Sequence, residues 1–169
     1  MASRLPRAGV SYITTATHGR RPIFEITRVA SLFIETLLHY RTLGHYKLHA
    51  YVVMPDHVHL LLTPQNITLD QAVHLIKEGF TCRIESELPA WEENFTAYSI
   101  ANIHDLEVVR AYLHQLPVRA ALAPAAELYP HSSAHRKGVA TLPVSGSSSA
   151  QKSPISVEDA ATSLRKIAS

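Results

Sequence analysis

The sequence has little cysteine, no long apolar run and little net charge, and each shortage excludes a class of protein. Cys82 is the one cysteine among 169 residues, so an internal disulfide framework is excluded and we interpret Cys82 as a core side chain. No stretch of about eighteen apolar residues occurs, and the first residues lack the apolar segment of a signal peptide. We therefore expect a cytoplasmic protein that is neither exported nor membrane-spanning.

The net charge of the chain is small although charged residues are present. Sixteen Lys and Arg against fourteen Asp and Glu give a formal charge of +2, which permits a nucleic-acid partner without requiring one. Hydrophobic residues make up 46% and charged residues 18%, the balance of a folded globular domain.

Seven segments show the apolar periodicity of regular secondary structure. Alternating or β-branched stretches predict strands at residues 10–16, 47–54, 57–64 and 94–101. Apolar residues at helical spacing predict helices at residues 28–43, 69–88 and 105–116. The order is β-α-β-β-α-β followed by a helix, which predicts an α+β fold of the split β-α-β type, an antiparallel sheet with helices packed on it.

Capping and breaking residues set the predicted boundaries. Thr68 or Asp70 can cap the second helix, and Pro89 ends it. Asp105 can cap the third helix, and Pro117 is expected to break it. The composition changes after this region, so we assign residues 1–137 to one domain and residues 138–169 to a flexible tail rich in Ser, Ala and Pro.

The stretch "MPDHVHLLLTP", residues 54–64, places two histidines one residue apart on a predicted strand. Successive side chains alternate between the faces of a strand, so His57 and His59 project together. Two adjacent imidazoles can share one metal ion. The alternative is two histidines that are satisfied by ordinary hydrogen bonds within a half-buried sheet.

Four further motifs occur in order around this stretch. They are "YITTATHGRRPIF" near the start, "LIKEGFTCRI" in the second helix, "AYLHQLPVRAAL" in the third, and "YPHSSAHR" after it. Together with "HVH" they make residues 8–137 resemble the single-tyrosine HUH transposases, and among these the REP-associated tyrosine transposases. The resemblance implies a ferredoxin-like fold with a tyrosine-bearing helix after the fourth strand.

The resemblance also implies a reaction. His57 and His59 would hold Mg²⁺ or Mn²⁺, and Tyr112 would attack a phosphodiester of single-stranded DNA, leaving a 5′-phosphotyrosine and a free 3′-OH. A phenol with a pKa of about 10 is a poor nucleophile, so a metal on the scissile phosphate would lower the barrier. The expected partner is single-stranded or hairpin DNA, bound by a monomer or a homodimer.

The sequence departs from the family pattern at the expected third metal ligand. Relatives carry Asn or Gln four residues after the tyrosine, where this chain has Leu116, which cannot coordinate a metal. Gln115 is the candidate replacement, and His114 lies farther round the helix. An alternative reading is therefore a DNA-binding protein on the same fold with impaired catalysis.

DNA contacts are a second point of departure. Ser99 and Ala101 stand where relatives often have arginine, so phosphate contacts must come from elsewhere. The candidates are the basic residues Arg20, Arg21, Lys77, Arg83, Arg110 and Arg119. Tyr12 and Tyr98 are open to two interpretations, sheet packing and base stacking. An RNA-binding module is a third reading, disfavoured because the sheet lacks an aromatic RNA-binding run.

Overall fold

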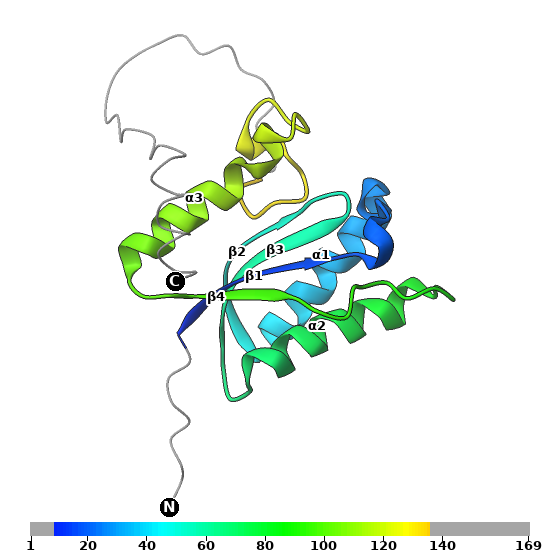
Figure 1. Ribbon diagram of the computed structural model, residues 1–169, viewed down its shortest axis with the longest axis horizontal. Coiled ribbons are helices and arrows are strands. Elements are labelled where there is room, and N and C mark those ends of the chain that lie inside the picture. Colours follow the sequence, from blue (N-terminus) through cyan, green and yellow to red (C-terminus); the bar gives the residue numbers. More distant parts are fainter. Residues whose placement is uncertain (1–8, 136–169) are drawn as a thin grey trace, which may run out of the picture.

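Four strands form one antiparallel sheet in the order β2-β3-β1-β4 in the computed structural model, which describes residues 9–135 (Figure 1). The strands are β1 Val10–Ala16, β2 Tyr46–Val53, β3 His57–Pro64 and β4 Thr96–Ile100. The predicted strands are confirmed, with β1 and β3 at the predicted bounds. The central pair β1 and β3 carries the residues on which the site is built.

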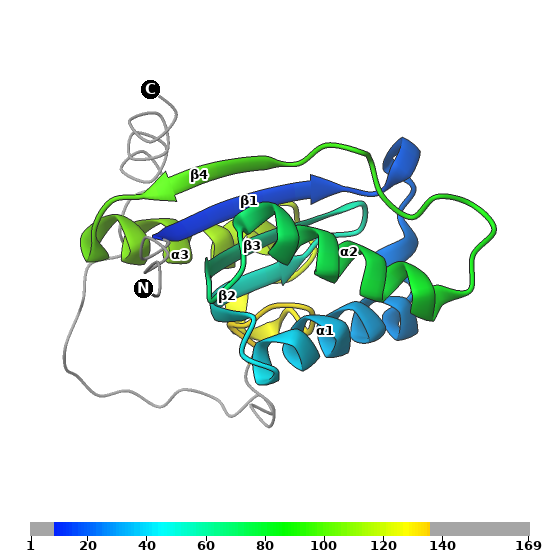
Figure 2. The same cartoon turned by 90° about the horizontal axis from the view of Figure 1, so that it is seen from below.

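The helices lie in two layers, one on each face of the sheet. Helices α1 and α2 cover one face, whereas α3 lies over the other (Figures 1 and 2). Their bounds are α1 Thr27–Thr42, α2 Leu69–Ile84 and α3 Ile103–Arg119, with short 3-10 turns at His18–Arg20, Ile23–Glu25 and Ala126–Leu128. This order confirms the predicted α+β, split β-α-β fold.

Each face of the sheet has its own apolar core. Between the sheet and helices α1 and α2, the rings of Phe24, Phe33, Phe80 and Trp91 lie 5.5–5.8 Å apart, centroid to centroid. On the α3 face a second cluster is built from nine core residues and their neighbours. These core residues include Tyr12, Ala50, Val52, Leu61, Val109, Leu113 and Tyr129.

Helix α2 begins as predicted and ends earlier than predicted. The Thr68 hydroxyl accepts a hydrogen bond from the backbone N–H of Gln71, whose side chain in turn accepts from the Thr68 N–H. The helix stops at Ile84 because Glu85 adopts a left-handed conformation, with φ of 48°. The expectation that it reaches Leu88 is therefore wrong. The interpretation of Cys82, on the same helix, as a core side chain is also wrong, because Cys82 is exposed.

Helix α3 differs from its prediction at both ends. Asn102, three residues before Asp105, caps the helix by accepting a hydrogen bond from the Asp105 N–H. At the other end the helix continues through Pro117 to Arg119. Pro117 lies in the last turn, so only two helical residues follow the hydrogen bond that it removes.

Residues 120–135 return along the outer edge of β2 and fix the end of α3. The Val53 N–H donates to the His131 carbonyl over 2.8 Å, and the Ser133 N–H donates to the Tyr51 carbonyl over 2.9 Å. The buried Tyr129 hydroxyl donates to the Val53 carbonyl over 2.6 Å. The predicted flexible tail, residues 138–169, lies outside the described residues, as does the end of the predicted domain at residue 137.

None of the helices within residues 9–135 combines the length and the apolar character that crossing a membrane requires.

Candidate active site

His57 and His59 lie side by side on β3, on the face of the sheet that α3 covers. The strand register pairs His57 with Ala16 and His59 with Thr14 of β1. The two imidazole rings are 4.8 Å apart, centroid to centroid, and nearly perpendicular at 81°. His57 is half-buried and His59 is 9% exposed. The predicted common face of the two histidines is confirmed.

Asp56, at the turn between β2 and β3, holds the ring of His57. Its carboxylate oxygen Oδ1 lies 2.6 Å from His57 Nδ1. The backbone of Asp56 is fixed in turn, because its carbonyl accepts hydrogen bonds from the N–H and the hydroxyl of Thr17 at 2.9 and 3.0 Å. A carboxylate only accepts hydrogen bonds, so the proton of the neutral His57 ring sits on Nδ1 and the Nε2 lone pair is free.

Two hydroxyl groups of β1 meet the Nδ1 atom of His59. The Tyr12 hydroxyl lies 2.7 Å away and the Thr14 hydroxyl 3.1 Å away. Burial, assisted by the nearby His57 and Arg20, lowers the pKa of His59 to about 3. The imidazole is therefore neutral near pH 7, the form that binds metal ions.

Tyr112 belongs to α3, so it lies on the same face of the sheet as the two histidines. Its phenol is near Tyr12, whose pKa is raised to about 12, first by burial and to a smaller extent by Tyr112 and Tyr98, with Thr14 acting in the opposite direction. The guanidinium carbon of Arg119 lies 5.7 Å from the centroid of the half-buried Tyr112 ring. No residue within 9–135 forms a hydrogen bond with the Tyr112 hydroxyl.

The residues that follow Tyr112 on α3 point in different directions. Leu116 packs against the apolar cluster that contains Val109 and Leu113. Gln115 is exposed, and His114 Nε2 lies 2.8 Å from the Ser133 hydroxyl. The assignment of Gln115 as the third metal ligand stays a prediction.

The donor set suits a two-imidazole metal site. Both Nδ1 atoms are occupied by partners, and both Nε2 atoms are free to bind. No group of three His, Cys, Asp or Glu side chains able to hold a metal ion occurs in the described part of the chain. A hard ion such as Mg²⁺ or Mn²⁺ prefers oxygen, so waters and phosphate oxygens would complete its coordination. The metal itself stays a prediction.

Two of the predicted DNA-binding arginines lie beside these groups. The Arg20 side chain is 64% exposed, and its guanidinium lies 3.7 Å from the carboxylate of Asp56. Arg119 lies over the Tyr112 ring. Arg110 lies two residues before Tyr112 on α3. It forms an ion pair with Glu107, with 2.8 Å between its guanidinium nitrogen and the carboxylate oxygen. Arg20 therefore lies near His57 and His59, and Arg119 lies near Tyr112. Contact of either arginine with DNA stays a prediction.

The other three predicted contacts are engaged away from the histidines. Arg21 donates to the carbonyls of His18 and Pro89. The remaining two, Lys77 and Arg83, belong to α2 on the opposite face of the sheet (Figure 1), where Lys77 donates to the Glu92 carbonyl, and Arg83 to the Thr36 hydroxyl and Glu35. DNA binding by these three residues stays a prediction that their present contacts do not favour.

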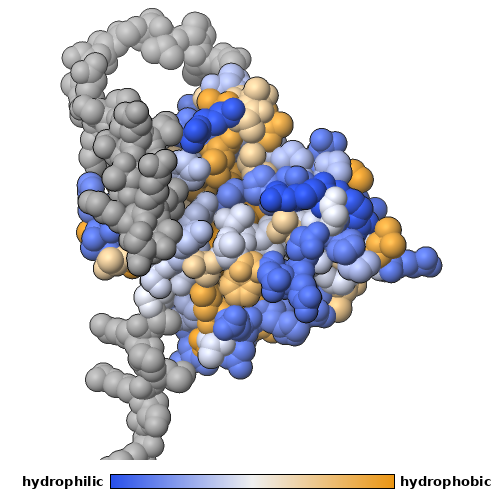
Figure 3. Space-filling model, in the orientation of Figure 1, coloured by the Kyte–Doolittle hydropathy of each residue, from blue (hydrophilic) through white to orange (hydrophobic). Residues whose placement is uncertain are grey.

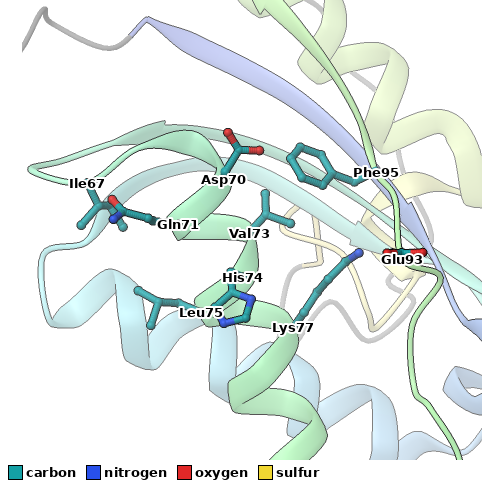
Figure 4. A pocket seen from close by; sticks show the side chains of 9 residues that line it. All are labelled: Ile67, Asp70, Gln71, Val73, His74, Leu75, Lys77, Glu93 and Phe95. Carbon is teal, nitrogen blue, oxygen red and sulfur yellow. The ribbon is translucent and has the colours of Figure 1, made fainter.

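A groove of about 590 Å³ lies between α2 and the segment before β4, on the face away from the histidines. Its apolar lining includes Ile67, Val73 and Phe95, and Lys77 extends along it toward residues 92–93 (Figure 4). An apolar patch between β4 and α2 is visible in Figure 3. The groove contains no histidine or tyrosine of the candidate active site.

Sequence reasoning missed the groups that hold the two histidines. The place of Asp56 directly before His57 is a sequence signal for a carboxylate partner. Tyr12 and Thr14 alternate on one strand, which puts both on one face. Their pairing with His59 depends on the register of β1 against β3, which the sequence does not reveal.

Comparisons with known proteins give a family and a fold. The family model described as "Transposase IS200 like" matches residues 11–116. A solved REP-associated tyrosine transposase bound to a REP hairpin is 19% identical, covers 93% of this chain and 99% of its own, and superposes with a TM-score of 0.67. A transposase-like protein from Deinococcus radiodurans R1 is 20% identical, covering 64% and 91%, with a TM-score of 0.49. No curated protein matches the chain.

Proposed function

The chain belongs to the family of IS200-like transposases, and from that premise we propose that it cleaves and rejoins single-stranded DNA through a phosphotyrosine at Tyr112. The two histidines of β3, His57 and His59, would hold a divalent metal, Mg²⁺ or Mn²⁺. The proposal goes beyond family membership in naming the nucleophile, the metal ligands and the form of the DNA.

One observation carries the proposal: the helix that bears Tyr112 lies on the face of the sheet to which His57 and His59 project. His57 and His59 project from β3 toward the α3 side, and α3 brings Tyr112 to that side within the same chain. Leu113, next to Tyr112, is fully buried in the apolar cluster, which fixes the helix on the sheet. This arrangement supports a site completed within one chain, as a monomer or in each subunit of a homodimer.

The chemistry assigned to these residues balances. The Tyr112 oxygen forms a bond to phosphorus, the bond from phosphorus to the 3′-oxygen breaks, and the phenol proton is passed to the released 3′-oxygen, which becomes the free 3′-OH. A metal held by the two imidazoles would neutralise charge on the phosphate oxygens. Arg20 and Arg119 would position the strand through its phosphates. Reversal of the same step with a different 3′-OH joins the strands.

The form of the DNA follows from the reach of the nucleophile. A tyrosine on a helix must approach a phosphate that a paired strand partly shields, so a single strand or an imperfect hairpin is the favoured substrate. The similar REP-associated transposase is bound to a hairpin. We therefore propose single-stranded or hairpin DNA as the partner of this chain.

The test is the formation of a covalent adduct between the purified chain and a single-stranded oligonucleotide in Mn²⁺ or Mg²⁺. We expect a slower-migrating species in a denaturing gel that requires the metal. Tyr112→Phe should abolish it, whereas Tyr98→Phe, a tyrosine on β4, should retain it. An adduct that survives Tyr112→Phe would overturn the assignment of the nucleophile.

A second candidate function rests on Leu116. Its side chain belongs to the apolar cluster, and the described residues supply no third His, Cys, Asp or Glu ligand. On that basis the chain would bind DNA without cutting it. Specific binding to hairpin DNA with no adduct at any metal concentration would favour this alternative, whereas metal-dependent adduct formation would exclude it.

A further inference from the structure

The two histidines are held by partners of different chemistry. The carboxylate of Asp56 beside His57 can only accept a hydrogen bond, so it fixes the ring proton on Nδ1. The hydroxyl of Tyr12 beside His59 can accept or donate. If the Tyr12 hydroxyl accepts, the proton of His59 sits on Nδ1 and the Nε2 lone pair is free. If the hydroxyl donates, the proton sits on Nε2 and prevents that nitrogen from binding a cation.

We propose that Tyr12 is a positioning residue that accepts the Nδ1–H of His59 and so keeps the Nε2 lone pair of His59 available for a divalent cation. The inference deepens the proposed function, because it assigns a role at the same site to a residue outside the histidine pair. Thr14 supports the same proton from the neighbouring position on β1.

The placement of Tyr12 leaves its hydroxyl little freedom. The residue is 5% exposed, and its ring plane is within 5° of the plane of the His59 ring, with the centroids 5.8 Å apart. On its other side the ring of Tyr98 stacks at 6.3 Å and 22°. The hydroxyl is therefore held at Nδ1 by the packing of its own ring.

Thr14 adds a second oxygen at the same nitrogen. Tyr12 and Thr14 are two residues apart on β1, so both point to the α3 side, and the register places Thr14 directly opposite His59. Their hydroxyl oxygens lie 2.7 and 3.1 Å from Nδ1. One N–H can be shared between two acceptors, and this arrangement stabilises the Nδ1–H form of His59.

The first experiment reads the proton of His59 directly in the metal-free protein. Long-range ¹H–¹⁵N correlation spectra distinguish the two neutral tautomers of each histidine. We expect the Nδ1–H form for His59 in the parent and a shift toward Nε2–H in Tyr12→Phe. The control Tyr98→Phe removes a stacked hydroxyl that does not touch His59, and it should match the parent. An Nε2–H form in the parent would overturn the proposal.

The second experiment titrates Mn²⁺ and follows binding by electron paramagnetic resonance. Removing the hydrogen-bond partner of a metal-ligating histidine weakens metal binding by about tenfold or more. Tyr12→Phe should therefore lower the Mn²⁺ affinity by at least about tenfold, whereas Tyr98→Phe should stay within about twofold of the parent. Thr14→Val, which keeps the shape of the side chain, should weaken binding severalfold and serves if Tyr12→Phe does not fold. Unchanged Mn²⁺ affinity in Tyr12→Phe, or in Thr14→Val where Tyr12→Phe does not fold, would overturn the proposal.

The two readouts separate this inference from the proposed function. An Nδ1–H tautomer that depends on Tyr12, together with tight metal binding and no DNA adduct, supports the positioning role and counts against cleavage. DNA cleavage that persists with unchanged metal affinity in Tyr12→Phe supports the proposed function and refutes the role of Tyr12.

Discussion

Leu116 follows Tyr112 by one helical turn, yet its side chain contributes to the apolar cluster with Val109 and Leu113. At this position packing and metal coordination make opposite demands. An apolar side chain stabilises the contact between α3 and the sheet, whereas an amide would supply an oxygen donor one helical turn from Tyr112. The identity of the third ligand is therefore a question that substitutions at Leu116 and Gln115 can answer.

We expect Leu116→Asn to tighten Mn²⁺ binding and raise adduct formation, because it restores an amide oxygen one turn from Tyr112. The same change should lower the free energy of unfolding by about 1–3 kcal/mol, since a polar amide enters an apolar cluster. Urea unfolding and Mn²⁺ titration measure the two effects. Weaker metal binding in Leu116→Asn would contradict the expectation.

The opposing hypothesis is that Gln115 already serves as the third ligand. Gln115→Ala should then lower Mn²⁺ affinity and cleavage, and it should leave stability nearly unchanged because Gln115 is exposed. Leu116→Asn should in that case change little. A parent that cleaves well and is insensitive to both substitutions would refute both accounts of the third ligand.

The buried imidazole of His59 makes the stability of the metal-free protein depend on pH. An unfolded chain protonates His59 below about pH 6.5, whereas the folded chain does so only near its lowered pKa of about 3. Between these values the unfolded state binds more protons, so the free energy of unfolding should fall as the pH falls. The slope from this residue is at most about 1.4 kcal/mol per pH unit, and the contribution is constant above pH 6.5.

Urea unfolding in EDTA across pH 4–8 measures this slope. His59→Gln removes the titrating group, so it should flatten the profile below pH 6.5 relative to the parent. The lowered pKa values of His49, His114 and His131 act in the same direction and remain in the variant. Parallel profiles for parent and variant would show that His59 does not carry the effect.

At the scale of elements, local sequence signals identified the strands and most helix starts. The alternation in residues 10–16 and 57–64 matches β1 and β3 because both strands are central and their patterns are dictated by burial on the sheet. The end of α2 was missed because Glu85 stops the helix by taking a left-handed conformation, for which its residue type gives no signal. The end of α3 was also missed, because the helix continues for two residues beyond Pro117.

The candidate site was predictable only in part, for the same reason. His57, His59 and Tyr112 occur in short motifs, so the sequence identifies them. Tyr12 meets His59 across 47 residues of sequence, and Ser133 meets His114 across 19. Such partners depend on strand register and on the return of residues 120–135 to β2, which no local pattern encodes.

The return segment fixes the tyrosine helix through Ser133. Its hydroxyl lies 2.8 Å from His114 Nε2 and accepts a hydrogen bond of 3.0 Å from the Tyr51 N–H. We expect Ser133→Ala to lower the free energy of unfolding by about 1 kcal/mol and to slow adduct formation, because the end of α3 is less firmly held. Hydrogen exchange of α3 amides should rise.

Ser99→Ala is the matched control, because Ser99 is exposed on β4 and lies away from α3. It should change neither the exchange of α3 amides nor the rate of adduct formation. Equal exchange in the parent and in Ser133→Ala would show that the contact with His114 does not hold the helix.

At the scale of the whole molecule, the sheet separates a structural face from a candidate functional face. Helices α1 and α2 pack on one side around the aromatic core, and their arginine Arg83 is tied to Thr36 and Glu35. The other side is covered by α3 (Figure 2). The two histidines of β3 project to that side. With a net charge of only +2, DNA affinity must come from where the charges lie rather than from how many there are.

This division predicts which arginines contribute to the salt dependence of DNA binding. Each phosphate contact on a single strand contributes about 0.7 to the slope of log affinity against log salt concentration. Arg20→Gln and Arg119→Gln, beside the histidines and Tyr112, should each weaken binding to a single-stranded oligonucleotide and reduce that slope by about 0.7. Fluorescence anisotropy from 50 to 300 mM salt measures both quantities.

Arg83→Gln provides the control, because it removes the same charge from the opposite face. It should lower thermal stability, since it breaks the contacts with Thr36 and Glu35, and leave the salt slope unchanged. A duplex of the same sequence should bind more weakly than the single strand in every variant. If Arg83→Gln reduces the slope as much as Arg20→Gln does, the DNA does not bind specifically on the face that carries the histidines and Tyr112.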